Sequence, residues 1–289
     1  MVLRRRWHYD SRMSASLDAS QLSRTSTPQP FGEHLRQWRQ RRRLSQLDLA
    51  SDAAISTRHL SFVETGRASP SREMVLRLAE RLDIPLRERN ALLVAAGFAP
   101  MYRERALDDP ALAAARQAVD LILKAHEPYP ALAIDRHWNL VSHNRTVPLL
   151  MADAAPDLLE PPVNVLRLSL HPRGIAPNIV NLAQWRSHLF ERLRQQIGST
   201  GDASLATLLD ELRGYPVPEG ASDVALPGEL AGVVMPFQFR TAAGVLSFIS
   251  TTTIFGSPVD VTLQELAMET FFPADAFTAD VLRSLVAAS

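Results

Sequence analysis

Apolar residues recur at helical spacing from residue 31 to residue 97, and they divide this stretch into five short helices. The first helix carries Phe31, Leu35 and Trp38 on one face. The last helix follows Pro85 and ends at Gly97, because proline cannot continue a helix and glycine favours the residue after one. Five helices of this size predict a compact all-α domain.

Residues 44–66 predict two of these helices, joined by a tight turn. Ser45 is a predicted N-cap, with Asp48 three residues later to return the hydrogen bond, and Ser56 is a second N-cap. Small Ala50 permits a close crossing of the two helices. This is the pattern of a helix-turn-helix, whose second helix offers its N-terminal residues to the DNA major groove. An ordinary helical hairpin is the alternative.

The segments LSQ, LA, ISTRHLSFVETG and PS, between about Phe31 and Leu82, resemble the DNA-binding domain of the Xre or lambda-repressor-like family. One departure is Ala54, where this family usually has glycine at the turn. A left-handed residue other than glycine costs roughly 1–2 kcal/mol. We therefore expect a slightly different turn here.

The resemblance implies that the second helix of the pair faces the bases. Arg58 can fork onto guanine O6 and N7, whereas Phe62 either touches a thymine methyl or packs internally. Gln46 opens the preceding helix, where its side chain and nearby amides can meet a phosphate, and Arg67 is a second phosphate candidate. The predicted DNA-binding residues are Gln46, Ser56, Thr57, Arg58, Ser61, Phe62 and Arg67.

Beyond residue 112 short strand-like runs alternate with helices. The predicted strands are Tyr129–Ile134, Trp138–Ser142, Val233–Arg240 and Gly244–Thr253. The predicted helices are Ala113–His126, Asn144–Met151, Val163–Leu170, Pro177–Ile197, Leu205–Leu212 and Asp275–Val286. Val261–Phe272 fits either a strand or a helix. This order predicts an α+β domain around an antiparallel sheet.

The segments HEPYPALAIDRHWNLVSHN, NVLRLSLHPRGIAP and FISTTTIFGSPVDVTLQELAMETFFPADAFT resemble the MmyB-type ligand-binding domain. In bacterial transcription regulators this domain follows an Xre-like head. Together the two resemblances cover about residues 31–285. They imply a PAS-like fold with a central pocket, for which a fatty acid has been proposed as the ligand.

An apolar face on the predicted strands could be plain core or the lining of that pocket. Polar residues at family positions or among apolar neighbours are candidate anchors for a head group, although each could simply hydrogen-bond within the fold. The predicted ligand-binding residues are Trp138, Asn144, Leu166, Arg167, Leu170, His171, Asn181, Trp185, Phe237, Phe239, Arg240 and Phe248.

Length and charge agree with two domains. The chain has 289 residues and no net charge, but residues 1–105 carry 19 arginines and 11 acidic residues, a charge of +8, and the remainder carries −8. A basic head on an acidic body suits DNA binding. We predict a flexible tail at 1–28, a helix-turn-helix domain at 29–98, a linker at 99–112 and a ligand-binding domain at 113–289.

Several classes of protein are disfavoured. The chain has no cysteine for disulfides, no apolar run near 18 residues and no apolar segment after its N-terminal arginines, so we expect a cytoplasmic protein without a membrane span. It lacks HExxH, GxSxG and glycine-rich phosphate motifs, and we expect no enzyme, catalytic residue or cofactor. The scattered histidines give no metal-ligand spacing.

These patterns predict a transcriptional regulator that binds double-stranded DNA as a homodimer. Its second domain would sense a small apolar or amphipathic molecule, such as a fatty acid. The alternative is a regulator whose second domain recognises a protein. The operator, the sign of regulation, the effector and the dimer surface are not written in the sequence.

Overall fold

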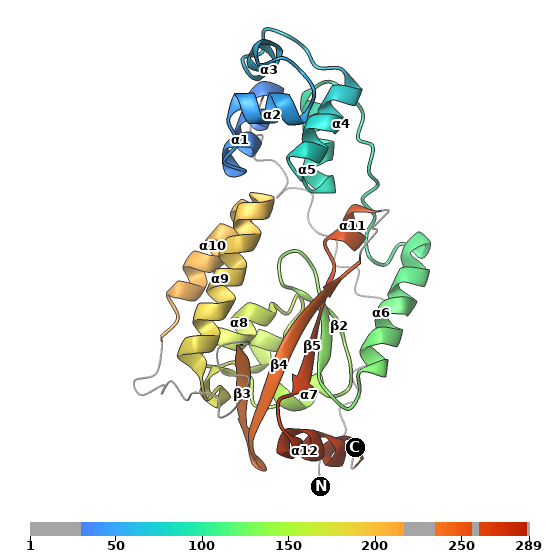
Figure 1. Cartoon of the computed structure of the whole chain (residues 1–289). Coiled ribbons are helices and arrows are strands. Elements are labelled where there is room, and N and C mark those ends of the chain that lie inside the picture. Colours follow the sequence, from blue (N-terminus) through green and yellow to red (C-terminus); the bar gives the residue numbers. More distant parts are fainter. Residues whose placement is uncertain (1–29, 217–234, 256–259, 288–289) are drawn as a thin grey trace.

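The computed structural model describes residues 30–216, 235–255 and 260–287. The predicted tail at 1–28 and the beginning of the strand predicted from Val233 lie outside these residues. A helical head comes first and an α+β body follows it (Figure 1).

The head contains the five predicted helices. Ser45, Ser56 and Ser71 each accept a hydrogen bond from the backbone amide three residues later, so each begins a helix as its N-cap. The apolar faces then meet in one core around Trp38 and Leu60, both fully buried. The helices are α1 (Phe31–Arg41), α2 (Gln46–Asp52), α3 (Thr57–Glu64), α4 (Arg72–Arg81) and α5 (Leu86–Ala95).

The turn between α2 and α3 differs from our expectation. Ala54 adopts the left-handed conformation with φ +53°, so the turn keeps the shape usual for glycine. Ala53 before it is buried and closes α2, and Ile55 after it packs against the core of the head. Packing on both sides therefore holds Ala54 in a conformation that its own side chain disfavours.

The body is built on a five-stranded antiparallel sheet in the order β2-β1-β5-β4-β3. This confirms the predicted α+β class. The strands are β1 (Ala131–Ile134), β2 (Leu140–His143), β3 (Pro236–Thr241), β4 (Gly244–Ile254) and β5 (Ala267–Pro273). The helices are α6 (Ala113–Ala125), α7 (Val147–Leu150), α8 (Val165–Leu170), α9 (Leu182–Thr200), α10 (Ala203–Arg213), α11 (Val261–Gln264) and α12 (Ala276–Ala287).

The ambiguous segment Val261–Phe272 contains both types of element, α11 and then β5. The helix predicted over Pro177–Ile197 begins later, because Ala176–Asn178 forms a separate short 3-10 turn and α9 starts at Leu182. Asn181 precedes α9 and uses its side chain elsewhere, since its amide and carbonyl bond Pro236 O and Gln238 N of β3.

The sheet has helices on both faces, because neighbouring strand residues point to opposite sides. On one face α6 covers β1 and β5, with Val119 and Leu123 packed against Ala131, Ala133 and Met268. On the other face α8 and α9 lie over Phe237 and Phe248, α10 packs on α8 and α9, and together they form the main core of the body.

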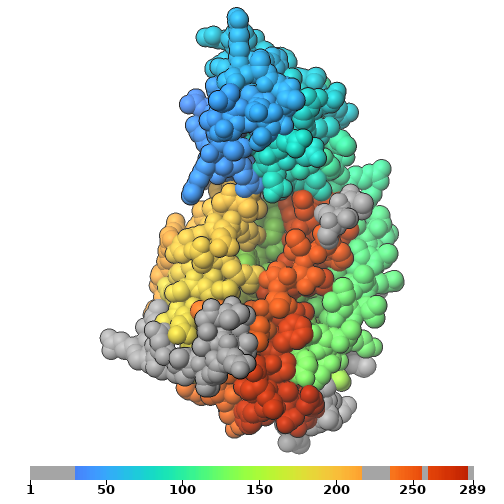
Figure 2. Space-filling model, viewed as in Figure 1, coloured from blue at the N-terminus to red at the C-terminus, as the bar shows by residue number. Residues whose placement is uncertain are grey.

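The head and the body meet through α5 and α11 (Figures 1 and 2). Arg87 of α5 forks onto Glu265, with Nε–Oε1 and Nη2–Oε2 distances of 2.8 and 2.9 Å. These hydrogen bonds raise the pKa of the Arg87 guanidinium above its usual value. The Leu86 amide donates to Gln264 Oε1 at 2.8 Å. We call these contacts of Leu86 and Arg87 the α5–α11 clasp.

The segment between the two parts is also held in place. The Asn90 side chain bonds the backbone of Met101 and Tyr102. Further along, Arg105 pairs with Asp260, whose carboxylate is fully buried, and the Arg105 carbonyl accepts from Thr262 Oγ1. The predicted linker is therefore fixed to the head at one end and to the body at the other.

Candidate DNA-binding surface and effector cavity

The second helix of the helix-turn-helix, α3, displays most of the predicted base-facing residues. Arg58 is exposed, and Thr57, Ser61 and Phe62 are partly exposed. The guanidinium carbons of Arg58 and Arg67 lie 5.4 and 6.0 Å from the centre of the Phe62 ring. Cation–π attraction holds both guanidinium groups near the ring. Phe62 therefore supports both arginines at the surface, besides any contact of its own.

Ser56 and Gln46 have structural partners. Ser56 caps α3 through its hydroxyl, which accepts from the His59 amide. Gln46 Nε2 donates to Glu64 Oε2 at 2.7 Å. Arg39 of α1 forks onto the same carboxylate at 2.6 and 3.0 Å, and the Glu64 side chain is 1% exposed. This buried network fixes the start of α2 and the end of α3 against α1.

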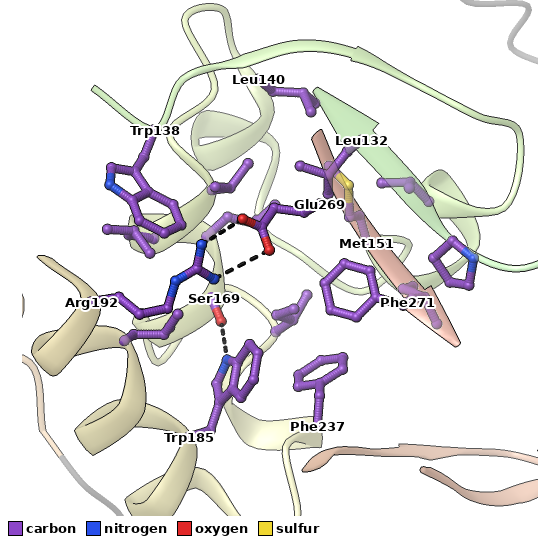
Figure 3. Close-up of a pocket in the computed structure, with 18 residues that line it drawn as sticks. Leu132, Trp138, Leu140, Met151, Ser169, Trp185, Arg192, Phe237, Glu269 and Phe271 are labelled. Atoms are coloured by element: carbon purple, nitrogen blue, oxygen red, sulfur yellow. Dashed lines mark hydrogen bonds and ion pairs between the residues drawn. The ribbon is translucent and has the colours of Figure 1, made fainter. Parts of the chain in front are cut away.

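An apolar cavity of about 100 Å³ lies in the body, between the sheet and the helices α8 and α9. Trp138, Trp185, Phe237 and Phe271 supply aromatic walls (Figure 3). Trp138 enters from the β1–β2 turn in a left-handed conformation, φ +67°, and its indole Nε1 donates to Gln196 Oε1 of α9. The other lining residues are Pro130, Leu132, Leu140, Val147, Leu150, Met151, Val165, Leu166, Leu168, Ser169, Ile175, Leu189, Arg192 and Glu269.

One ion pair faces this cavity. Arg192 of α9 donates to both carboxylate oxygens of Glu269 on β5, at 2.6 and 3.2 Å (Figure 3). Thr252 Oγ1 accepts from Arg192 and donates to Glu269. The Glu269 side chain is 6% exposed and that of Arg192 is 23% exposed. The Arg192 guanidinium also lies 4.8 Å from the Trp138 ring.

Two further polar groups lie beside the pair. Ser169 Oγ accepts from Trp185 Nε1 at 3.1 Å. The His188 ring stacks near Trp185, with ring centres 5.5 Å apart. Burial, and then the charge of Arg192, lower the pKa of His188 below its usual value of 6.5. This shift favours the neutral ring at pH 7, and the charges of Arg192 and Glu269 cancel among the described lining residues.

Four predicted ligand-binding residues line the cavity: Trp138, Leu166, Trp185 and Phe237. Leu170, Phe239 and Phe248 lie in the core around it. The structure places the predicted polar anchors elsewhere. Asn144 bonds the backbone of Leu123 and Tyr129, and Asn181 bonds β3. Arg240 is exposed at the end of β3.

Arg167 and His171 have partners outside the cavity too. Arg167 donates from Nε and Nη2 to the two carboxylate oxygens of Glu211 on α10, each at 2.8 Å. These hydrogen bonds lower the pKa of the Glu211 carboxyl. His171 packs edge-on against Tyr215 and accepts from the Arg173 amide. Both residues therefore join segments of the body.

Sequence reasoning missed Arg192 and Glu269. A usable signal existed for Arg192, because Trp185, Leu189 and Arg192 share one face of a helix at spacings of four and three. Glu269 is the one charged position inside the apolar run Ala267–Pro273. Assigning that run to a strand would have placed Glu269 and Phe271 on the same side of the sheet.

The described ranges contain no cluster of histidine and acidic side chains suited to a metal ion. No helix within them is long and apolar enough to cross a membrane.

Comparison with known families gives two matches. A helix-turn-helix domain model matches residues 30–92, and a model of the MmyB-like transcription regulator ligand binding domain matches residues 115–285. Neither is an enzyme family. A search of curated proteins found nothing similar. The second match spans more than half of the 289 residues and follows the head observed in the fold, so the chain belongs to the MmyB-like transcription regulators, with a helix-turn-helix domain for DNA and a ligand-binding domain behind it.

Proposed function

We propose that this regulator binds its operator as a homodimer and senses a small apolar or amphipathic molecule, such as a fatty acid, in the cavity of the body. The observation that supports the ligand class is the cavity wall, which is apolar and aromatic except for Ser169 and the Arg192–Glu269 pair. Such a wall favours an apolar body on the ligand with a small polar end. The protein would work where bacterial DNA lies, in the cytoplasm.

The two elements that carry the ion pair also reach the head. Glu269 lies four residues after Glu265, the body's partner in the α5–α11 clasp. Arg192 lies on α9, whose last turn approaches the head at Ser199, with its carbonyl 3.5 Å from Arg42 Nη2. A ligand that moves α9 relative to β5 would thus change contacts with the head. It alters DNA binding only if it has different affinities for the two arrangements.

The size of the cavity limits the ligand. One water needs roughly 10–15 Å³ on this scale, so about 100 Å³ holds roughly seven to ten atoms of that size. A medium-length chain fits, whereas a longer acyl chain requires the cavity to enlarge.

Mass spectrometry of an organic extract from the purified full-length protein tests the ligand. We expect one stoichiometric amphiphile that is absent from an unrelated protein prepared in parallel. Operator binding is then measured by fluorescence anisotropy with and without that compound, over a range of salt. Because phosphate contacts dominate, affinity should fall steeply as salt rises.

Unchanged operator affinity with the compound bound would contradict sensing, and the DNA-binding assignment would stand. An empty extract, together with no binding of added amphiphiles, would favour the alternative in which the body recognises a protein.

A further inference from the structure

Among the described residues that line the cavity, the charges sum to zero. Arg192 and Glu269 are the charged side chains in that set, and their charges cancel across a bidentate pair. Burial lowers the pKa of neighbouring His188, which favours the neutral ring at pH 7. Any ionised ligand would therefore bring an unbalanced charge into an apolar enclosure, and such burial is costly.

A ligand carboxylate would have to compete with Glu269 for the same guanidinium. Glu269 is almost fully buried, so displacement would leave its charge without its partner. Breaking a buried pair in this way is strongly unfavourable. An ammonium ligand could donate to Glu269 beside Arg192, but its positive charge would have no buried partner, and that burial is costly.

Glu269 still has hydrogen-bonding capacity. An ionised carboxylate accepts about four hydrogen bonds. Within the part of the chain that the structure describes, Oε1 accepts from Arg192 and Thr252, and Oε2 accepts from Arg192 alone. One acceptor position on Oε2 is therefore open to a ligand that donates.

We propose that the effector is an uncharged amphiphile with a hydrogen-bond donor at its polar end, such as a medium-chain alcohol or primary amide. The donor bonds Glu269 and leaves the Arg192–Glu269 pair intact, while the chain lies against Trp185, Phe237 and Phe271. A fatty acid enters this site in its protonated form. The inference rests on the proposed function, since it requires the cavity to be the effector site.

Four probes with one chain length test the head group in the wild-type full chain. Isothermal titration calorimetry at pH 7.5 compares 1-octanol, octanamide, octanoate and octylammonium, each below its aggregation concentration. We expect the alcohol and the amide to bind at least about tenfold more tightly than either ion, a difference of about 1.4 kcal/mol. Octanoate binding equal to or tighter than octanol binding would overturn the inference and leave the proposed function standing.

A second experiment removes the negative charge of the Arg192–Glu269 pair. Glu269→Gln leaves the cavity with the unbalanced charge of Arg192, so octanoate affinity should rise about tenfold or more over wild type. Glu191 is an exposed residue of α9 that directly precedes Arg192. Glu191→Gln makes the same chemical change there and should leave the affinity for the same ligand unchanged. Circular dichroism establishes that both variants fold.

The outcomes distinguish a failure of the head-group selection from a failure of the proposed effector site. If no probe binds and none displaces an apolar fluorescent reporter, the cavity is not an effector site, and both the inference and the ligand part of the proposed function fail. If all four probes bind equally, the head-group selection fails alone. If Glu269→Gln folds and gains no affinity for octanoate, the ion pair does not set the selection.

Discussion

Ala54 shows how one residue can work against its own conformational preference. Glycine at this turn would remove the left-handed penalty of about 1–2 kcal/mol but would add about 0.5–1 kcal/mol of chain entropy on unfolding. We expect Ala54→Gly to raise the free energy of unfolding by about 0.5–1 kcal/mol, measured by urea denaturation.

The neighbouring residue is the control. Ala53 is buried at φ −87°, so Ala53→Gly should lower the free energy of unfolding by about 1 kcal/mol. A loss of stability in Ala54→Gly would mean that the exposed methyl group makes a contact worth more than the strain.

Arg58 and Arg67 share the ring of Phe62 but should act differently on DNA. Arg58→Ala should relax sequence preference at one base pair, because the lost fork is worth about 1–3 kcal/mol of discrimination. Arg67→Ala should weaken binding to all sequences and reduce the salt slope by about one. Selection from a randomised DNA library, followed by salt titrations, measures both effects. Unchanged preference in Arg58→Ala would refute its role in reading bases.

Residues with local partners could be read from the sequence, and residues with distant partners could not. Ser45 and Ser56 each bond an amide three residues away, so spacing alone located these two caps. Arg192 and Glu269 are 77 residues apart, and nothing in a linear pattern joins them. The polar anchors predicted in their place, such as Asn144 and Arg167, instead bond segments of the body.

At the scale of elements, Glu64 holds three helices of the head together. Glu64→Ala should leave Arg39 buried without its partner, because the two form a nearly inaccessible ion pair. Loss of one partner from such a pair costs about 3–5 kcal/mol. Guanidinium denaturation followed by helical circular dichroism should show an earlier transition of the head.

The matched control is Glu73→Ala on α4, which breaks an exposed pair with Arg77 and should cost no more than about 0.5 kcal/mol. Equal effects of the two variants would mean that the buried network does not hold the helices.

The succession of elements was predictable because each long helix and strand repeats its period several times. Short elements carried less information. The four residues of α11 follow the helical period and the seven of β5 follow the strand period, so the joint pattern over Val261–Phe272 fitted either type of element. Their separate roles, one at the head and one at the cavity, appear only when the strand order is known.

For the whole molecule, the Arg87–Glu265 contact should couple head and body. In a double-mutant cycle of Arg87→Ala and Glu265→Ala, we expect a coupling energy of about 0.5–3 kcal/mol in chemical unfolding. The exposed pair Arg283–Asp280 on α12 gives the reference cycle, with about 0.5 kcal/mol or less. Additive effects for Arg87 and Glu265 would show that the contact contributes nothing to the junction.

The segment fixed by Asn90 at one end and by Asp260 and Thr262 at the other has a consequence for sensitivity. A short tether gives the two surfaces it joins an effective concentration in the millimolar range or above, so even a weak contact stays mostly closed. The arrangements with this contact closed and open would then differ in free energy by only a few kcal/mol. An effector that favours one of them by about 1.4 kcal/mol changes their ratio tenfold, so a small ligand has enough leverage to control the head.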